Sequence, residues 1–277
     1  MNISVYPVIV TCLNERPVIS RMLFMCAERL GIDVVASVHC QSDKELVAHY
    51  GHFAVMNEAN YPGQKWNNAL RYAMSKHYTH FLIMGDDDSL SNDGFNLLIE
   101  AAVQGKHHVG FDACGFYDTL KTRSMIFQYT TEAYRLIGAG RLISRTAVDA
   151  AVNQKRIIVQ RSLPKFQIQA GEVIDKPAVI SDYLVGIGVA RHSSESPGYL
   201  WPELVKSGLD GHSELKLVIA GYAPEYVGDN RVHVCDFKSS RNIWKYGDLR
   251  SHGRECDSRE ITWFLSEEER EYLASIV

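Results

Sequence analysis

The sequence lacks the features that mark several classes of protein. Its six cysteines are widely separated and never spaced as CxxC, which argues against a zinc knuckle or a disulfide scaffold and favours free thiols in a reducing cytosol. No stretch approaches the roughly 18 apolar residues that a membrane span needs. The formal net charge of −4 argues against a basic surface that coats nucleic acid. We therefore expect a soluble, cytoplasmic protein.

The N-terminal stretch also lacks the pattern of a secretory signal. MNISVYPVIVTCLNERP has neither a positively charged start nor a long apolar centre, so it predicts a first strand. At 277 residues, the chain is long enough for one large domain or two small ones, with a sizeable core. It contains no internal repeat or low-complexity tract.

Strand and helix patterns alternate along the N-terminal third of the chain. Strands are predicted over residues 5–13, 32–40, 52–59 and 81–85, with helices between them over residues 17–31, 42–51 and 61–80. Pro17 suits the first turn of the first helix, and Gly31 suits its end. This order predicts an α/β fold with a mixed, mostly parallel sheet flanked by helices. Such sheets bind ligands outside the carboxyl ends of their strands.

The pattern becomes less regular toward the C-terminus. After a helix over residues 94–105, strands are predicted within residues 107–120 and 123–131, and later over residues 215–222 and 231–237. Ser144 marks a helix onset, and Ser266 with Glu269 has capping-box spacing at the start of a closing helix. We expect a core over residues 1–192 and a C-terminal extension, residues 193–277, packed on the same domain.

One apolar strand, FLIMG, runs directly into three consecutive carboxylates, Asp86, Asp87 and Asp88. Side chains alternate in direction along a strand, and the following turn lets the third carboxylate swing back toward the first. Such hard oxygen ligands suit Mg²⁺ or Mn²⁺, whose remaining positions are filled by water and substrate phosphates. The alternative is a solvated acidic turn in which Asp86 or Ser89 caps a helix.

The surrounding residues resemble a known family. YPGQKWNNALRYAMSKHYTHFLIMGDDDSL is similar to the central motif of GT-A glycosyltransferases, in which a Gly-containing loop and an Asn-bearing helix precede a strand that ends in a DxD metal motif. The matching positions are Gly63, Lys65, Asn68, Ala69, Asp86 and Asp88. VIVTCLNERP resembles the first strand and nucleotide-binding loop of that fold, which implies that the base of a sugar nucleotide lies near Thr11, Asn14 and Arg16.

Two further segments resemble the same family. IGAGRLISRTAVDAA is similar to its Gly-rich acceptor-side segment, where Gly138, Ala139 and Gly140 would let the backbone approach the donor sugar; a tight turn before a helix is the alternative. SDYLVGIGVA resembles the E-D-V-x-x-G segment of inverting members. Asp182 would then be the general base, or alternatively only a helix cap. Ser181 departs from the acidic residue of that pattern.

The resemblance also implies a divalent ion and positive charge at the leaving diphosphate. Asp88 and Asp86 would hold Mn²⁺ or Mg²⁺, with Asp86 also able to contact the ribose. A C-terminal histidine often supplies a third ligand in this family, and we take His233 from the candidates His192, His212, His233 and His252. Lys65, Arg141 or a C-terminal basic residue would supply further positive charge.

Four motifs in the order of the family imply a metal-dependent, inverting glycosyltransferase that uses a nucleoside-diphosphate sugar such as a UDP-sugar to donate a hexose or pentose. Residues 1–192 would bind the nucleotide sugar and metal, and residues 193–277 would lie on the acceptor side. The acceptor could be a saccharide. Cations and aromatics interleave over Phe237–Arg254, which fits a hydroxymethylated base in DNA, a diphosphate clamp or a plain surface loop.

Two other functions remain open. A nucleotidyltransferase acting on sugar phosphates would carry a Gly-rich phosphate loop after the first strand, whereas TCLNERP has no glycine. A non-catalytic module that binds sugar nucleotides would keep the fold without turnover.

Overall fold

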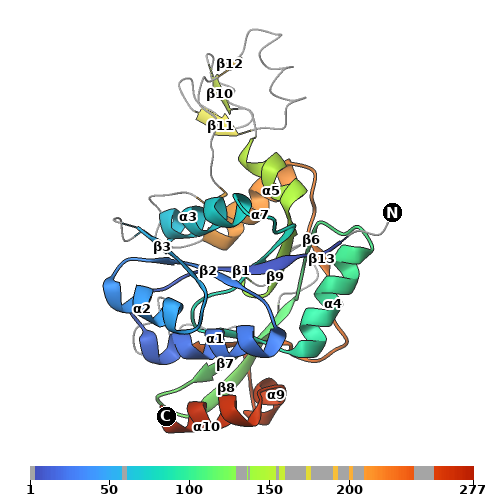
Figure 1. Ribbon diagram of the computed structural model, residues 1–277. Helices are drawn as coiled ribbons and strands as arrows, with labels where there is room; N and C mark the ends of the chain where they lie inside the picture. The colour runs from blue at the N-terminus through green and yellow to red at the C-terminus, as the bar shows by residue number, and fades with distance from the viewer. Residues whose placement is uncertain are drawn as a thin grey trace.

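The computed structural model describes residues 4–57, 61–128, 136, 138–153, 156–159, 173–175, 190–192, 200–201, 209–239 and 253–277 (Figure 1). These residues form a seven-stranded sheet, a five-stranded sheet and a three-stranded sheet made of β10 (Arg156–Val159), β11 (Val173–Asp175) and β12 (Ala190–His192). Helices cover the seven-stranded sheet, so the predicted α/β class is confirmed. Among the helices described, none has the length and apolar character to cross a membrane.

The seven-stranded sheet is mixed and mostly parallel, as predicted. Its strand order is β13-β6-β9-β4-β1-β2-β3. Only β9 runs antiparallel to its two neighbours, β4 and β6, while the other pairs in this sheet are parallel. The strands are β1 (Pro7–Cys12), β2 (Val34–Val38), β3 (Phe53–Met56), β4 (His80–Ile83), β6 (His108–Gly110), β9 (Arg141–Ser144) and β13 (Glu225–Tyr226). Strands β1 to β4 therefore end at one common edge.

The predicted alternation of the first four strands with helices is confirmed. The connecting helices are α1 (Pro17–Leu30), α2 (Gln41–His49) and α3 (Pro62–Met74). Helices α1 and α3 both begin with proline, whose fixed backbone angle and missing N–H suit a first helical turn. Helix α1 ends at Gly31, which takes a left-handed conformation with φ of 67°.

Two apolar cores lie on opposite faces of the seven-stranded sheet. On one face, α3, α5 (Arg145–Val152) and α7 (Leu209–Ile219) cover residues such as Val8 and Val10. On the other face, α1 and α4 (Asn92–Val103) cover residues such as Ile9 (Figure 1). The alternation along β1 thus sends successive apolar side chains into different cores, which explains why the strand reads as a continuous apolar run.

The five-stranded sheet joins segments that are far apart in the sequence. Its order is β15-β8-β7-β14-β5, built from β5 (Asp88–Leu90), β7 (Ala113–Asp118), β8 (Arg123–Gln128), β14 (Val234–Lys238) and β15 (Gly253–Cys256). The C-terminal strand β14 lies between β5 and β7. Its register places Asp236 opposite Asp88, the last of the three consecutive carboxylates.

The C-terminal helices close this second sheet. Helices α9 (Arg259–Thr262) and α10 (Glu267–Ser275) follow β15, and Ile261 and Leu273 pack in a third core with Phe237 of β14. The predicted capping box is confirmed, because the Ser266 hydroxyl accepts from the Glu269 amide at 3.1 Å and the Glu269 carboxylate accepts from the Ser266 amide at 2.7 Å.

The strand predicted over residues 215–222 is wrong, because most of this segment belongs to helix α7. Its apolar, β-branched residues suggested a strand, but burial follows a helical pattern. Ser213 and Leu217, four residues apart, are fully buried, whereas Leu215 and Val218 are 55% and 44% exposed. Helix α7 packs against α5, and it does not add a strand to the seven-stranded sheet.

The close packing of α9 on β7 can be tested at Gly115. A Cβ atom at Gly115 would lie 2.5 Å from the Cβ of Ile261, so Gly115→Ala forces the helix away from the strand. We expect its free energy of unfolding, measured by urea denaturation, to fall by about 1–3 kcal/mol. Gly228→Ala is the matched control, since nothing lies within 4 Å of the added atom. Equal stability of the two variants would contradict this packing.

Candidate functional site

The three consecutive carboxylates lie at the edge where β1 and β4 end, and they are buried. Asp86, Asp87 and Asp88 are 1%, 8% and 4% exposed. The alternative of a solvated acidic turn is therefore wrong, and Ser91, not Asp86 or Ser89, caps the following helix α4. Because an isolated buried carboxylate is strongly destabilising, each of these groups requires positive charge or hydrogen-bond donors nearby.

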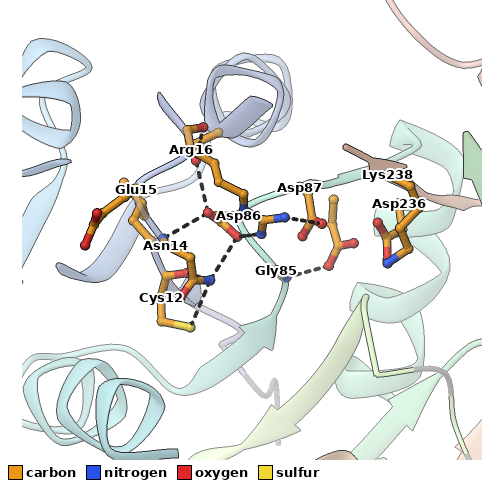
Figure 2. A network of polar contacts seen from close by, with 12 residues as sticks. Cys12, Asn14, Glu15, Arg16, Gly85, Asp86, Asp87, Asp236 and Lys238 are labelled. Atoms are coloured by element: carbon orange, nitrogen blue, oxygen red, sulfur yellow. Dashed lines mark hydrogen bonds and ion pairs between the residues drawn. The ribbon is translucent and has the colours of Figure 1, made fainter. Parts of the chain in front are cut away.

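Arg16 supplies much of that charge (Figure 2). Its guanidinium forms an ion pair with Asp86 and another with Asp87, the latter with 3.0 Å between Nη1 and Oδ2. The planar fork of arginine suits two neighbouring carboxylates. Arg16 directly precedes Pro17 of α1, so the loop after β1 is tied to the turn after β4.

The first carboxylate is further enclosed by the same loop. The Asn14 backbone amide donates to Asp86 Oδ2 at 3.1 Å, the Asn14 side-chain amide donates to Oδ1 at 3.3 Å, and the Ser20 hydroxyl donates to Oδ2 at 3.1 Å. Both oxygens of Asp86 thus have donors within the protein (Figure 2). Burial and the nearby Asp87 raise the pKa of Asp86, although Arg16 opposes them.

The remaining predicted nucleotide-loop residues lie close to this network. The Lys65 ammonium is fully buried and donates to the Leu13 carbonyl at 2.8 Å and to the Asn14 side-chain oxygen at 3.4 Å. Lys65 therefore holds the loop after β1 from the side of α3. Thr11 is buried on β1, and its hydroxyl is without a hydrogen-bond partner among the described residues.

Other predicted residues make their contacts on α3, on β4 and between β9 and α7. Gly63 lies buried in the first turn of α3, and the Asn68 side chain accepts a hydrogen bond from Arg71 at 2.8 Å. Gly140 has φ of 72° and donates to the Ile83 carbonyl of β4 at 2.8 Å. Arg141 is fully buried on β9, where its guanidinium donates to the Gly138 carbonyl at 3.2 Å and to the Ser213 hydroxyl at 3.3 Å.

A second acidic group is formed by Asp87, Asp88 and Asp236, which we call the acidic triad. Oxygens of the three carboxylates lie within 4.8 Å of one another. Asp236 comes from β14, directly opposite Asp88 in the strand register. The Lys238 ammonium forms an ion pair with Asp236 on the side of the triad away from Arg16 (Figure 2).

The pKa values of the triad reflect this crowding. Burial and repulsion from Asp236 and Asp87 raise the pKa of Asp88 well above its usual range. Burial and repulsion from Asp87 raise the pKa of Asp236 to about 7, against the opposing effect of Lys238. Burial also acts to raise the pKa of Asp87, but Arg16 and Lys238 outweigh it and hold that pKa below its usual value. A further cation among these oxygens would relieve the repulsion.

The acidic triad fits a divalent cation. All of its potential ligands are carboxylate oxygens, the atoms that Mg²⁺ and Mn²⁺ prefer. The Oδ1 atom of Asp236 is buried without a hydrogen-bond partner among the described residues, so it has a free coordinating lone pair. The formal charge of this group is −2 when every side chain is ionised. It comes from the four carboxylates of Asp86, Asp87, Asp88 and Asp236 and the two cations paired with them, Arg16 and Lys238.

His233, the histidine assigned to the metal site, contacts different residues. Its Nδ1 lies 2.7 Å from the Ser91 hydroxyl, and its Nε2 lies 2.8 Å from Asp229 Oδ1. Both ring nitrogens thus have partners outside the acidic triad. The structure brings together Asp88, Asp87 and Asp236, whereas the expected set was Asp86, Asp88 and His233.

Several candidates lie beyond the described structure. Asp182 falls outside the described residues, as do His252 and the side chains of His192 and His212. The sequence analysis missed Asp236, because it lies within a predicted strand and no motif marks it, whereas Lys238 belongs to the stretch Phe237–Arg254, for which a diphosphate clamp was one alternative. Only the pairing of β14 with β5 brings them to the carboxylates.

Comparisons with known proteins give matches among solved structures only. No protein-family model and no curated protein matches the chain. It is similar to TarS of S. aureus in complex with UDP-GlcNAc, with 14% identity over 99% of this chain and 71% of that chain and a TM-score of 0.42. It is also similar to the mannosyltransferase PcManGT from Pyrobaculum calidifontis in complex with GDP-Man and Mn²⁺, with 11% identity over 98% of this chain and 73% of that chain and a TM-score of 0.47. At these identities and TM-scores, the function of this chain has to be argued from its own residues.

The central role of Arg16 can be tested by removing its charge. Arg16→Met leaves Asp86 and Asp87 buried without their ion-pair partner, so the free energy of unfolding should fall by about 3–5 kcal/mol in urea denaturation. Arg259→Met, which breaks an ion pair with Asp257 between side chains 88% and 47% exposed, should leave stability nearly unchanged. Similar stabilities for the two variants would contradict the role of Arg16.

Proposed function

We propose that the protein is a metal-dependent glycosyltransferase of the GT-A type, which transfers a sugar from a nucleoside-diphosphate sugar to an acceptor hydroxyl with inversion. The observation that carries the proposal is the acidic triad, in which Asp87 and Asp88 are buried at the sheet edge where β1 and β4 end. Three of the four motifs that resemble the family, those around Asn14, Lys65 and Gly140, have residues beside this edge. Strand β4 runs parallel to β1, and Asp86, Asp87 and Asp88 follow its carboxyl end. In α/β sheets, ligands bind outside the carboxyl ends of the strands.

The nucleotide is assigned to the loop after β1. Asn14 and Arg16 lie there, and Thr11 of β1 offers a buried hydroxyl that no described residue satisfies. Lys65 holds this loop through the Leu13 carbonyl, so the nucleotide would meet a preformed surface. Gly140 lies beside the end of β4, where the space that a Cβ would take is occupied by Val234 and Phe111, so its part in the donor site would be through its backbone only.

Asp88 is assigned as the principal ligand of Mn²⁺ or Mg²⁺, with Asp87 and Asp236 beside it. We prefer these partners to Asp86 and His233, because Asp86 already accepts from Arg16, Asn14 and Ser20, and both nitrogens of His233 have other partners. When bound, the ion supplies Lewis-acid charge that stabilises the leaving diphosphate.

Asp182 is assigned as the general base on its resemblance to the family segment. In a single displacement, the acceptor oxygen bonds to the anomeric carbon as the bond from that carbon to the diphosphate breaks. The proton of the acceptor hydroxyl passes to the Asp182 carboxylate. The stretch predicted to face the acceptor, Phe237–Arg254, lies mostly outside the described residues, so we name the acceptor only as a hydroxyl compound, with a saccharide first and a hydroxymethylated DNA base second.

The metal site is tested with Asp88→Asn. The variant keeps the shape of the side chain but removes one ligand charge, so Mn²⁺ binding measured by calorimetry should be lost, along with Mn²⁺-dependent hydrolysis in a screen of nucleotide sugars. Asp257→Asn on the surface is the control and should behave as wild type. Undiminished Mn²⁺ binding by Asp88→Asn would rule out the assigned site.

The general base is tested separately with Asp182→Asn. Because the base acts on the acceptor and not on the donor, the affinity for Mn²⁺ and nucleotide sugar should stay within about twofold of wild type. The turnover number should fall by about 10²–10⁴-fold in the same screen. Retained turnover would reject Asp182 as the base while leaving the donor site in place.

A further inference from the structure

Lys238 is a buried cation that the proposed function does not yet use. Its side chain is 8% exposed, and its ammonium is paired with Asp236. The backbone around it is fixed, because both the amide and the hydroxyl of Thr119 donate to the Lys238 carbonyl at 2.9 Å. The ammonium also lies 5.1 Å from the centre of the Phe116 ring. The strand therefore holds this charge in one place next to the acidic triad.

The pair between Lys238 and Asp236 leaves part of the carboxylate free. Lys238 contacts Oδ2 of Asp236, whereas Oδ1 is buried and has no hydrogen-bond partner among the described residues. One carboxylate can thus be shared between the ammonium and a divalent ion.

We propose that Lys238 is a second cation of the diphosphate site, which shares Asp236 with the divalent ion. This inference rests on the proposed function, and it adds Lys238 to the residues that bind the leaving diphosphate. Lys238 then has effects of opposite sign on two ligands. It weakens binding of the divalent ion alone, because like charges repel across a few ångströms, and it strengthens binding of the diphosphate, which is anionic.

This pair of effects separates the proposal from a purely structural role. If the lysine only holds β14 in place, its removal would loosen the triad and weaken binding of both the divalent ion and the diphosphate. If the lysine acts as a second cation, its removal would strengthen binding of the divalent ion and weaken binding of the diphosphate. The two affinities therefore move in opposite directions only if the charge itself acts on the ligands.

The test uses Lys238→Met and Lys238→Gln in the full chain, with binding measured by calorimetry. For Mn²⁺ alone, both variants should bind about tenfold or more tightly than wild type. For UDP and GDP at saturating Mn²⁺, both variants should bind about tenfold or more weakly. Lys238→Arg keeps the charge and should restore both affinities to within about threefold of wild type. Lys106→Met, which removes a surface ion pair with Glu225, is the matched control and should change neither affinity.

Failure of this inference can be told apart from failure of the proposed function. If wild type binds no Mn²⁺, the metal site is wrong and the role of Lys238 falls with it. If wild type binds Mn²⁺ and Asp88→Asn does not, but the charge-free Lys238 variants bind Mn²⁺ no more tightly, only the role of Lys238 is overturned. Unchanged affinity of these variants for UDP and GDP would overturn it equally. Urea denaturation checks that each variant is folded, and Lys238→Gln keeps a polar group for Asp236 should Lys238→Met not fold.

Discussion

The structure depends on offsetting the charge of four aspartates that are largely withdrawn from solvent. Asp86, Asp87 and Asp88 end a buried strand, and Asp236 lies across from them on β14. Desolvation of such groups is costly enough to prevent folding if they are left alone. Arg16 and Lys238 approach from opposite sides, and the backbone and side-chain amides of Asn14 and the Ser20 hydroxyl complete the environment of Asp86. With all four aspartates ionised, a formal charge of −2 remains. Protonation, which the raised pKa values of Asp86, Asp88 and Asp236 favour, or a bound divalent ion would offset this charge.

This constraint explains why residues from the two ends of the chain meet in the sheets. Strand β14 inserts between β5 and β7, and the Phe237 amide donates to the Asp87 carbonyl at 2.8 Å. Helix α10 is tied to the same place, because Glu269 pairs with Arg29 of α1, and Arg29 in turn donates to the Leu90 carbonyl of β5. The acidic triad is therefore complete only when the C-terminal segment has docked.

The sequence predicted the parts of the fold that local signals determine. Apolar runs punctuated by Pro17 and Gly31, and the capping box of Ser266 and Glu269, specify their own elements without help from distant residues. The segment of α7 was mistaken for a strand because a short apolar run with β-branched residues fits either structure, and packing on α5 decided it. Likewise, Asp86, Asp87, Asp88 and Arg16 stand at strand ends and could be found from the sequence. The position of Asp236 and Lys238 beside these carboxylates could not be found, because only the pairing of β14 with β5 makes them neighbours.

The three consecutive carboxylates divide between two environments, and their backbone geometry accounts for this. Asp86 and Asp87 occupy the turn after β4, while Asp88 begins β5 and faces β14. Asp86 turns toward the loop after β1 and has donors on both oxygens, Asp88 turns toward Asp236, and Asp87 contacts Arg16 while belonging to the triad. A D-x-D spacing does not by itself place both outer carboxylates on one ion. In this protein the first aspartate fixes the loop after β1 through Arg16 and Asn14, and under the proposed function the last one holds the cation. The middle aspartate joins the two environments, because it pairs with Arg16 and also belongs to the triad.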